Sequence, residues 1–259
     1  MPELEELLEL SKSIATQAGQ SLLSGLNQHH KNYFHSVDYP KEIKALADIV
    51  LEKEILQVLG LKGLPILSEE SGYIPGQQDS KYWFIVDPLD GTFNFVKGLG
   101  PSAVSIALWK DQKPIFGVIY NIVDRKLIWG GAGIGAYCDG QPISVSNVSI
   151  KNQASICTGF PVRLDLENEM IVQSFWRMVR LFAKVRMFGS AAVSLVYVAR
   201  GVSDVYFEEN IMLWDVAAGL AIVEGAGGTY AFKKTSVDWS YRVFASNEYL
   251  SSGFVDLFS

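Results

Sequence analysis

The stretch WFIVDPLDGTFNF, residues 83–95, decides the fold and indicates where the site lies. It opens with apolar residues 83–86, rich in aromatic and β-branched side chains, which predict a buried strand. The strand is expected to end at Asp87, because a proline follows it and Gly91 permits backbone angles closed to other residues. Two carboxylates, Asp87 and Asp90, are therefore predicted on a tight turn at the tip of a buried strand.

Carboxylates at such a tip are poorly solvated and repel each other, which raises their pKa values unless a cation lies between them. Magnesium takes its oxygen ligands from carboxylates and from a substrate phosphate. Thr92 adds a hydroxyl group, and the N–H groups of Gly91 and Thr92 offer hydrogen bonds to an anion. The combination predicts a metal-assisted phosphate site. Asp-Pro and Asp-Gly pairs also form ordinary turns, so an isolated motif of this kind leaves both interpretations open.

A second acidic cluster repeats this design. Residues 65–72, PILSEESG, form a short apolar strand pattern followed by Glu69 and Glu70. A third acid, Asp215, opens a predicted helix, where the positive end of the helix dipole favours a carboxylate. Alone, Glu69 and Glu70 are consistent with a solvated loop, and Asp215 with a helix cap. The recurrence of acidic groups beside strand ends favours metal ligation by Glu69 and Glu70.

Composition limits the class of protein. The chain has 259 residues, 49% of them hydrophobic, which is ample for a large core. A formal charge of −6 argues against a nucleic-acid partner. The absence of a long apolar run argues against a membrane partner, and the acidic N-terminus predicts a cytoplasmic location. Cys138 and Cys157 are expected to be free thiols, and all three histidines lie between residues 29 and 35, far from the acidic motifs.

The first half of the chain predicts helices and an antiparallel sheet. Apolar residues at helical spacing predict helices over 3–26 and 42–59. Residues 27–40 and 73–81 are predicted to be polar loops. Short connections predict an antiparallel sheet, with Asp139-Gly140 as a hairpin turn. Its strands are expected at 103–109, 115–120, 126–130, 134–138 and 143–145.

From residue 154 strands alternate with helices, which predicts a second, parallel or mixed sheet. The expected strands are 154–158, 185–188 and 202–207, and the expected helices are 166–182, 190–199 and 214–226. The change of pattern near residue 150 divides the chain into halves, 1–150 and 151–259. A GxGxxA pattern at 131–136 opens no helix, so a dinucleotide site is rejected there.

Residues 87–95, DPLDGTFNF, resemble the signature of the inositol monophosphatase family, which consists of lithium-sensitive, Mg²⁺-dependent phosphatases. Residues 214–219, WDVAAG, resemble the second signature of that family. The resemblance covers the chain from about residue 42 to its end. It implies a layered αβαβα sandwich with an antiparallel sheet and a second, mixed sheet. It also implies a homodimer.

The resemblance further implies two or three Mg²⁺ ions per site and inhibition by Li⁺. The implied metal ligands are Glu69, Asp87, the Leu89 carbonyl, Asp90 and Asp215. The implied catalytic residues are Thr92, Asp48 and Glu70. The implied substrate contacts are Asp90, Gly91, Thr92, Gly189, Ser190, Ala191 and Glu208. Without the resemblance, Asp48 reads as a solvated helical residue and Ser190 as a helix cap.

The chain departs from the family pattern just before Asp48, where Lys44-Ala45 replaces the usual Val-Thr. On a continuous helix Lys44 and Asp48 share a face, so Lys44 either replaces the family's loop lysine or forms a surface ion pair. The expected partner is a small phosphate monoester, with myo-inositol 1-phosphate leading. A bisphosphate nucleotidase, a fructose bisphosphatase, a histidinol phosphatase and a non-catalytic metal-binding regulator remain open alternatives.

Overall fold

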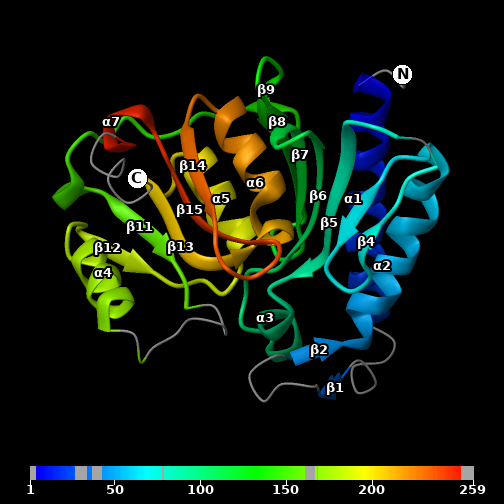
Figure 1. Cartoon of the computed structure of the whole chain (residues 1–259), viewed down its shortest axis with the longest axis horizontal. Helices are drawn as coiled ribbons and strands as arrows, with labels where there is room; N and C mark the ends of the chain where they lie inside the picture. The colour runs from blue at the N-terminus through cyan, green and yellow to red at the C-terminus, as the bar shows by residue number, and fades with distance from the viewer. Residues whose placement is uncertain are drawn as a thin grey trace.

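The protein forms five alternating layers of helices and sheets in a computed structural model that describes residues 4–26, 34–36, 43–77, 79–160, 167 and 169–251 (Figure 1). An outer helix layer covers an eight-stranded sheet, two helices separate this sheet from a five-stranded one, and a further helix covers the far face. The outer layer is α1 (Leu4–Leu26) and α2 (Leu46–Leu59), the middle layer α5 (Ala191–Ala199) and α6 (Leu213–Gly225), and the far helix α4 (Glu169–Val179). The layered αβαβα prediction is confirmed.

The eight-stranded sheet has the order β10-β9-β8-β7-β6-β5-β3-β4. Its strands are β3 (Ile66–Ser68), β4 (Gly72–Ile74), β5 (Tyr82–Asp90), β6 (Ala103–Lys110), β7 (Lys113–Asn121), β8 (Lys126–Gly131), β9 (Gly135–Cys138) and β10 (Gln141–Pro142). The strands from residue 103 onward pair antiparallel, as expected, whereas β3 and β5 run parallel, so the sheet as a whole is mixed. Asp139 and Gly140 form the predicted hairpin turn with positive φ angles.

The five-stranded sheet is also mixed, as predicted, and has the order β12-β11-β13-β15-β14. Its strands are β11 (Ser155–Thr158), β12 (Lys184–Arg186), β13 (Val205–Met212), β14 (Thr229–Lys234) and β15 (Ser240–Ser246). The first three are mutually parallel, and β15 joins β13 and β14 antiparallel. The remaining short elements are α3 (Thr92–Lys97), α7 (Glu248–Ser251), η1 (Gly60–Lys62) and η2 (Lys151–Gln153).

Alternation along the central strand accounts for the two cores around the first sheet. On β5, Phe84 and Val86 pack toward α1 and α2, whereas Ile85 packs toward α5 and α6. Successive side chains of a strand point to opposite faces, so an apolar run without polar interruptions is what a strand buried on both faces requires. The strand that bears the acidic motif is thus held from both sides.

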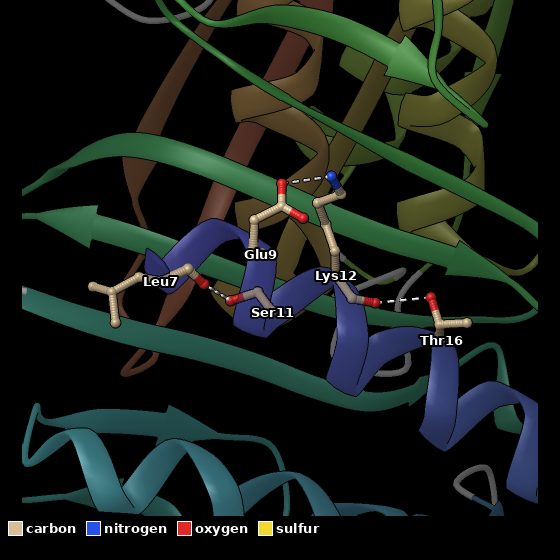
Figure 2. A network of polar contacts seen from close by, with 5 residues as sticks. All are labelled: Leu7, Glu9, Ser11, Lys12 and Thr16. Atoms are coloured by element: carbon tan, nitrogen blue, oxygen red, sulfur yellow. Dashed lines mark hydrogen bonds and ion pairs between the residues drawn. The ribbon is translucent and has the colours of Figure 1, made fainter. Parts of the chain in front are cut away.

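Helix α1 carries a network of polar contacts between its own turns (Figure 2). Ser11 is fully buried, and its hydroxyl donates to the Leu7 carbonyl at 2.8 Å, which satisfies a polar group on an otherwise apolar face. Lys12 pairs with Glu9 at 2.7 Å, and its ammonium lies 4.4 Å from the ring centroid of Trp129 on β8. Of these contacts, the one with Trp129 joins α1 to the first sheet, and the other two lie within the helix.

Two of the predicted boundaries in the first half of the chain differ in the structure. Residues 43–45 form β2 (Ile43–Ala45), paired with β1 (Phe34–Ser36), so the second helix begins at Leu46 rather than near residue 42. Lys44 is therefore not on a helical face with Asp48, and its side chain lies outside the described residues, as does most of 27–40. The predicted loop 73–81 contains part of β4.

Candidate active site

Strand β5 brings the central motif into the interior. It continues past its predicted end to Asp90, and its register against β6 shifts between Asp87 and Asp90. This irregularity lets both acids of the motif stay on the strand, buried with 1% and 7% of their surface exposed. Gly91 follows with φ of +80°, and a Cβ there would lie 2.7 Å from the Pro101 carbonyl oxygen. Only glycine fits this position.

Six carboxylates from four parts of the chain converge in two groups. In each group, three side chains place a carboxylate oxygen within 4.8 Å of the others. One group comprises Asp48, Glu69 and Glu70, and the other Asp87, Asp90 and Asp215. The charges of Asp48 and Asp215 both raise the pKa of Glu69, which shows that the two groups adjoin. We call Asp48, Glu69, Glu70, Asp87 and Asp215 the acidic end of the site.

Burial and mutual repulsion dominate the electrostatics of the acidic end. Burial raises the pKa of Glu69 well above its usual range, and nearby carboxylates raise it further. The pKa of Asp87 is raised by burial and then by the charges of Glu69, Asp90 and Asp215. The Asp87 Oδ1 atom accepts a hydrogen bond from Leu89 N at 3.0 Å, but its buried Oδ2 atom has no donor among the described residues. An orphaned carboxylate oxygen within an all-oxygen donor set fits a hard divalent cation.

The Thr92 hydroxyl links the end of β5 to helix α2 of the outer layer. Its hydroxyl lies 2.8 Å from Asp48 Oδ1 and 2.9 Å from the Leu89 carbonyl oxygen. Asp48, on α2, is 2% exposed, so the solvated interpretation of this residue was wrong. A hydroxyl bonded to a buried carboxylate is oriented, and its proton has an acceptor ready.

Helix α6 presents Asp215 from its first turn, and the loop before β15 holds this helix end. The Leu213 N–H donates to the Trp239 carbonyl at 2.8 Å, and Asp215 Oδ2 accepts from Met212 N at 3.2 Å. Trp239 has φ of +60°, which is rare for a bulky residue, and its ring stacks on Tyr73 of β4 with centroids 6.4 Å apart. The strained residue thus connects the second sheet to the first beside the acids.

Asp90 is held by the start of α5. It accepts hydrogen bonds from the Ser190 hydroxyl, from Ala192 N at 2.9 Å and from Ala191 N at 3.3 Å. These donors lower the pKa of Asp90, but burial is the larger effect and raises it to about 6. Ser190 also caps α5 by accepting from Val193 N, as the cap interpretation predicted, and its role as a substrate contact stays a prediction.

A cavity of about 210 Å³ opens beside Asp90. Its lining is Asp90, Thr158, Gly159, Phe160, Gly189, Ser190, Ala191, Ser194, Glu208, Ile211 and Asp215. Glu208 on β13 is 8% exposed and accepts a hydrogen bond from the Tyr206 hydroxyl at 2.9 Å. Burial raises the pKa of Glu208 to about 7, against the lowering effect of Tyr206. We call Glu208, Tyr206, Gly159 and Ser190 the pocket end of the site.

The predicted residues therefore meet around one place. Asp90, Gly189, Ser190, Ala191, Glu208 and Asp215 line the cavity, and the other predicted ligands form the adjoining acidic end. Gly91 and Thr92 do not line it and lie at the join of β5 and α3. Sequence reasoning missed Tyr206, whose hydroxyl faces Glu208, and Gly159, where a Cβ would lie 2.6 Å from Glu208 Oε1. Tyr206 had a local signal, because it lies two residues before Glu208 and alternation along a strand places both on one face. Gly159 had none, because its contact depends on where Glu208 lies in the fold.

This fold and site define a metal-assisted phosphatase of the layered sugar-phosphatase class. Residues 3–252 match the model of the inositol monophosphatase family. A protein of Aquifex aeolicus named fructose-1,6-bisphosphatase/inositol-1-monophosphatase is 34% identical over 89% of this chain and 87% of its own length. An inositol-1-monophosphatase of Synechocystis sp. is 34% identical over 95% of this chain and 86% of its length.

Solved structures of similar proteins have the same fold. Extragenic suppressor protein suhB from Bartonella henselae superposes with a TM-score of 0.83 at 33% identity, covering 94% of this chain and 95% of that one. The chain belongs to the inositol monophosphatase family, whose members are metal-dependent phosphatases. Among the described residues, none of the helices combines the length and apolar character that crossing a membrane requires.

Proposed function

We propose that this chain is a Mg²⁺-dependent phosphate monoester hydrolase whose leading substrate is myo-inositol 1-phosphate. The observation that supports it is the composition of the cavity. A buried carboxylate, Glu208, lies across the pocket from Asp90, and no lysine or arginine is among the described lining residues. Such a lining suits a neutral polyol, whose hydroxyl groups donate to a carboxylate, and disfavours a second phosphate group.

The cation-binding roles follow from the donor sets. Glu69 and Asp87 would hold one Mg²⁺ ion, and Asp87, Asp90 and Asp215 a second, with the Leu89 carbonyl as a backbone ligand. When bound, Mg²⁺ supplies a lowered pKa to a coordinated water and charge neutralisation to the leaving oxygen. The number of ions per site and inhibition by Li⁺ stay predictions.

The remaining groups orient the reactants. The Thr92 hydroxyl, bonded to Asp48, would orient the attacking water, and the Asp48 carboxylate would accept its proton. Glu70 would assist from the same acidic group. The N–H groups of Gly91 and Thr92 would bind the phosphate oxygens, and Gly189, Ser190, Ala191 and Glu208 the polyol.

Fructose 1,6-bisphosphate is the second candidate substrate, because the Aquifex aeolicus relative carries both activities in its name. The two candidate substrates differ in their number of phosphate groups, and the lining of the cavity bears on this difference. A bisphosphate needs a cationic partner for its second phosphate, and the described lining offers Glu208 instead.

Phosphate release from a panel of substrates with Mg²⁺ tests the proposal. The panel would contain inositol 1-phosphate, fructose 1,6-bisphosphate, histidinol phosphate and adenosine 3′,5′-bisphosphate. We expect the highest kcat/KM for inositol 1-phosphate and loss of turnover in Asp90→Asn. Glu54→Gln, an exposed change on α2, is the control and should keep wild-type activity. Unchanged turnover in Asp90→Asn would show that the site assignment is wrong, and absence of turnover on every substrate would favour the regulatory alternative.

A further inference from the structure

A second acid on α2 lies one turn after Asp48 and has no part in the roles proposed above. Glu52 is 6% exposed, close to the 2% of Asp48. Residues four apart share a helix face, so both carboxylates point from α2 toward the first sheet. Glu52 does not belong to either group of converging carboxylates.

Both carboxylate oxygens of Glu52 accept hydrogen bonds from one residue in the connection between β3 and β4. Glu52 Oε1 accepts from Ser71 N at 2.9 Å, and Oε2 accepts from the Ser71 hydroxyl at 2.7 Å. Ser71 follows Glu69 and Glu70 in the connection between β3 and β4, where Ser68 pairs with Gly72. The start of the same connection is fixed by Glu69 N, which donates to the Val86 carbonyl of β5 at 3.2 Å. The connection is therefore tied to β5 at one end and to α2 at the other.

Stability alone does not explain a carboxylate here. Burying a charge is costly, and no ion pair joins Glu52 to a lysine or arginine in the described part of the chain. The position also adds a negative charge to a region that already holds Asp48, Glu69 and Glu70. What the carboxylate uniquely provides is two charge-assisted acceptors in one plane, which fix the Ser71 backbone and side chain together.

We propose that Glu52 is a positioning residue for cation binding. By holding Ser71 against α2, it keeps the connection in the conformation in which Glu69 and Glu70 meet Asp48 within bonding range of one ion. Groups that orient metal ligands contribute to affinity without touching the metal, and their loss typically costs 10–100-fold in metal affinity. This inference rests on the proposed function only in requiring that the acidic end binds a divalent cation.

The test is direct cation binding by the metal-free full-length protein, without substrate. Mg²⁺ and Mn²⁺ would each be titrated by calorimetry into wild type, Glu52→Ala, Glu52→Gln and Ser71→Ala. We expect Glu52→Ala to bind each cation more weakly than wild type by about tenfold or more. Partial recovery is expected in Glu52→Gln, whose amide oxygen can still accept from Ser71 N, and a loss of a few-fold in Ser71→Ala. Glu54→Ala, the exposed acid on the same helix, should bind as wild type does.

A double-variant cycle separates positioning from general stability. If Glu52 acts through Ser71, then Glu52→Ala/Ser71→Ala binds no more weakly than Glu52→Ala alone. A purely structural role would lower the melting temperature of the metal-free protein and leave cation affinity unchanged, and that result in Glu52→Ala would overturn the inference. If Glu52→Ala fails to fold, Ser71→Ala decides, because Ser71 is exposed and the change removes only its hydroxyl group. Wild type that binds neither ion would overturn the proposed function and this inference together.

Discussion

The acidic end and the pocket end both hold buried carboxylates, yet the hydrogen-bonding needs of these carboxylates are met in opposite ways. At the pocket end, Glu208 has the Tyr206 hydroxyl, and Asp90, which borders both ends, has three donors from the start of α5. At the acidic end, carboxylates face one another, and the buried Oδ2 atom of Asp87 has no donor among the described residues. The comparison teaches that one end is complete in the protein alone, whereas the other needs a cation to neutralise it.

The largest expected effect comes from removing one charge at the acidic end. Asp87→Asn should lower kcat by about 10³-fold, because a bound cation contributes several kcal/mol and each 1.36 kcal/mol is tenfold in rate. The same change should raise the melting temperature of the metal-free protein, since it relieves repulsion among buried carboxylates. Phosphate release measures the change in kcat, and calorimetric melting in EDTA measures the change in melting temperature. A metal-free variant less stable than wild type would show that Asp87 is satisfied without a cation.

The stability of the metal-free protein should depend on pH, in a direction that follows from the raised pKa values of its buried acids. The folded-state pKa of Asp90 is raised from 3.8 to about 6 and that of Glu208 from 4.5 to about 7. At these two groups the folded metal-free protein binds protons more tightly than the unfolded protein, so the stability that they contribute is full below their unfolded pKa values and is lost as pH rises through 6 to 7.

In EDTA, we accordingly expect a melting temperature several degrees higher at pH 5.5 than at pH 8, since about 1 kcal/mol corresponds to roughly 2–4 °C at this chain length. Saturating Mg²⁺ should reduce or reverse the difference, because the cation binds the deprotonated acids. Melting curves across this range with and without Mg²⁺ measure it. Equal melting temperatures in EDTA at the two pH values would contradict the raised pKa values of these buried acids.

The smallest expected effect is at the pocket end. Tyr206→Phe removes one hydrogen bond to buried Glu208, so it should destabilise the protein by about 1–2 kcal/mol, opposite in sign to Asp87→Asn. KM for inositol 1-phosphate should rise a few-fold, with little change for p-nitrophenyl phosphate, which has no polyol to bind Glu208. Denaturant unfolding and kinetics on both substrates measure this. A stabilised Tyr206→Phe protein would remove the contrast between the two ends.

Local patterns predicted the elements that bear strong signals. Apolar residues 83–86 lie in β5, the turn after Trp109 lies between β6 and β7, and Ser190 caps α5. In each case the signal is contained within a few residues, through strand composition, turn chemistry or capping. The sequence also predicted that the separate acidic motifs lie close together in space, because repeated carboxylates at strand ends repel one another unless they share a cation.

Other elements were wrong or missed because their signals are not local. β14 and β15 were not predicted, since residues such as Lys233 and Arg242 interrupt the apolar pattern and pairing with β13 decides the strands. β2 was assigned to a helix, although Ile43 pairs with Ser36 from another segment. The division at residue 150, the homodimer, the cytoplasmic location and the catalytic roles of individual residues stay predictions.

From its own residues the sequence predicted a metal-assisted phosphate site and alternating helices and strands, because carboxylates, glycines and apolar periodicity act through their own properties and their near neighbours. The layered αβαβα arrangement was implied by the resemblance to the inositol monophosphatase family. Only the packed structure shows which acids are left unsatisfied, that Gly159 lies against Glu208, and that Glu52 holds Ser71. These depend on distances between residues remote in the chain. Burial then sets the strength of each charge, and burial is a property of the packed layers.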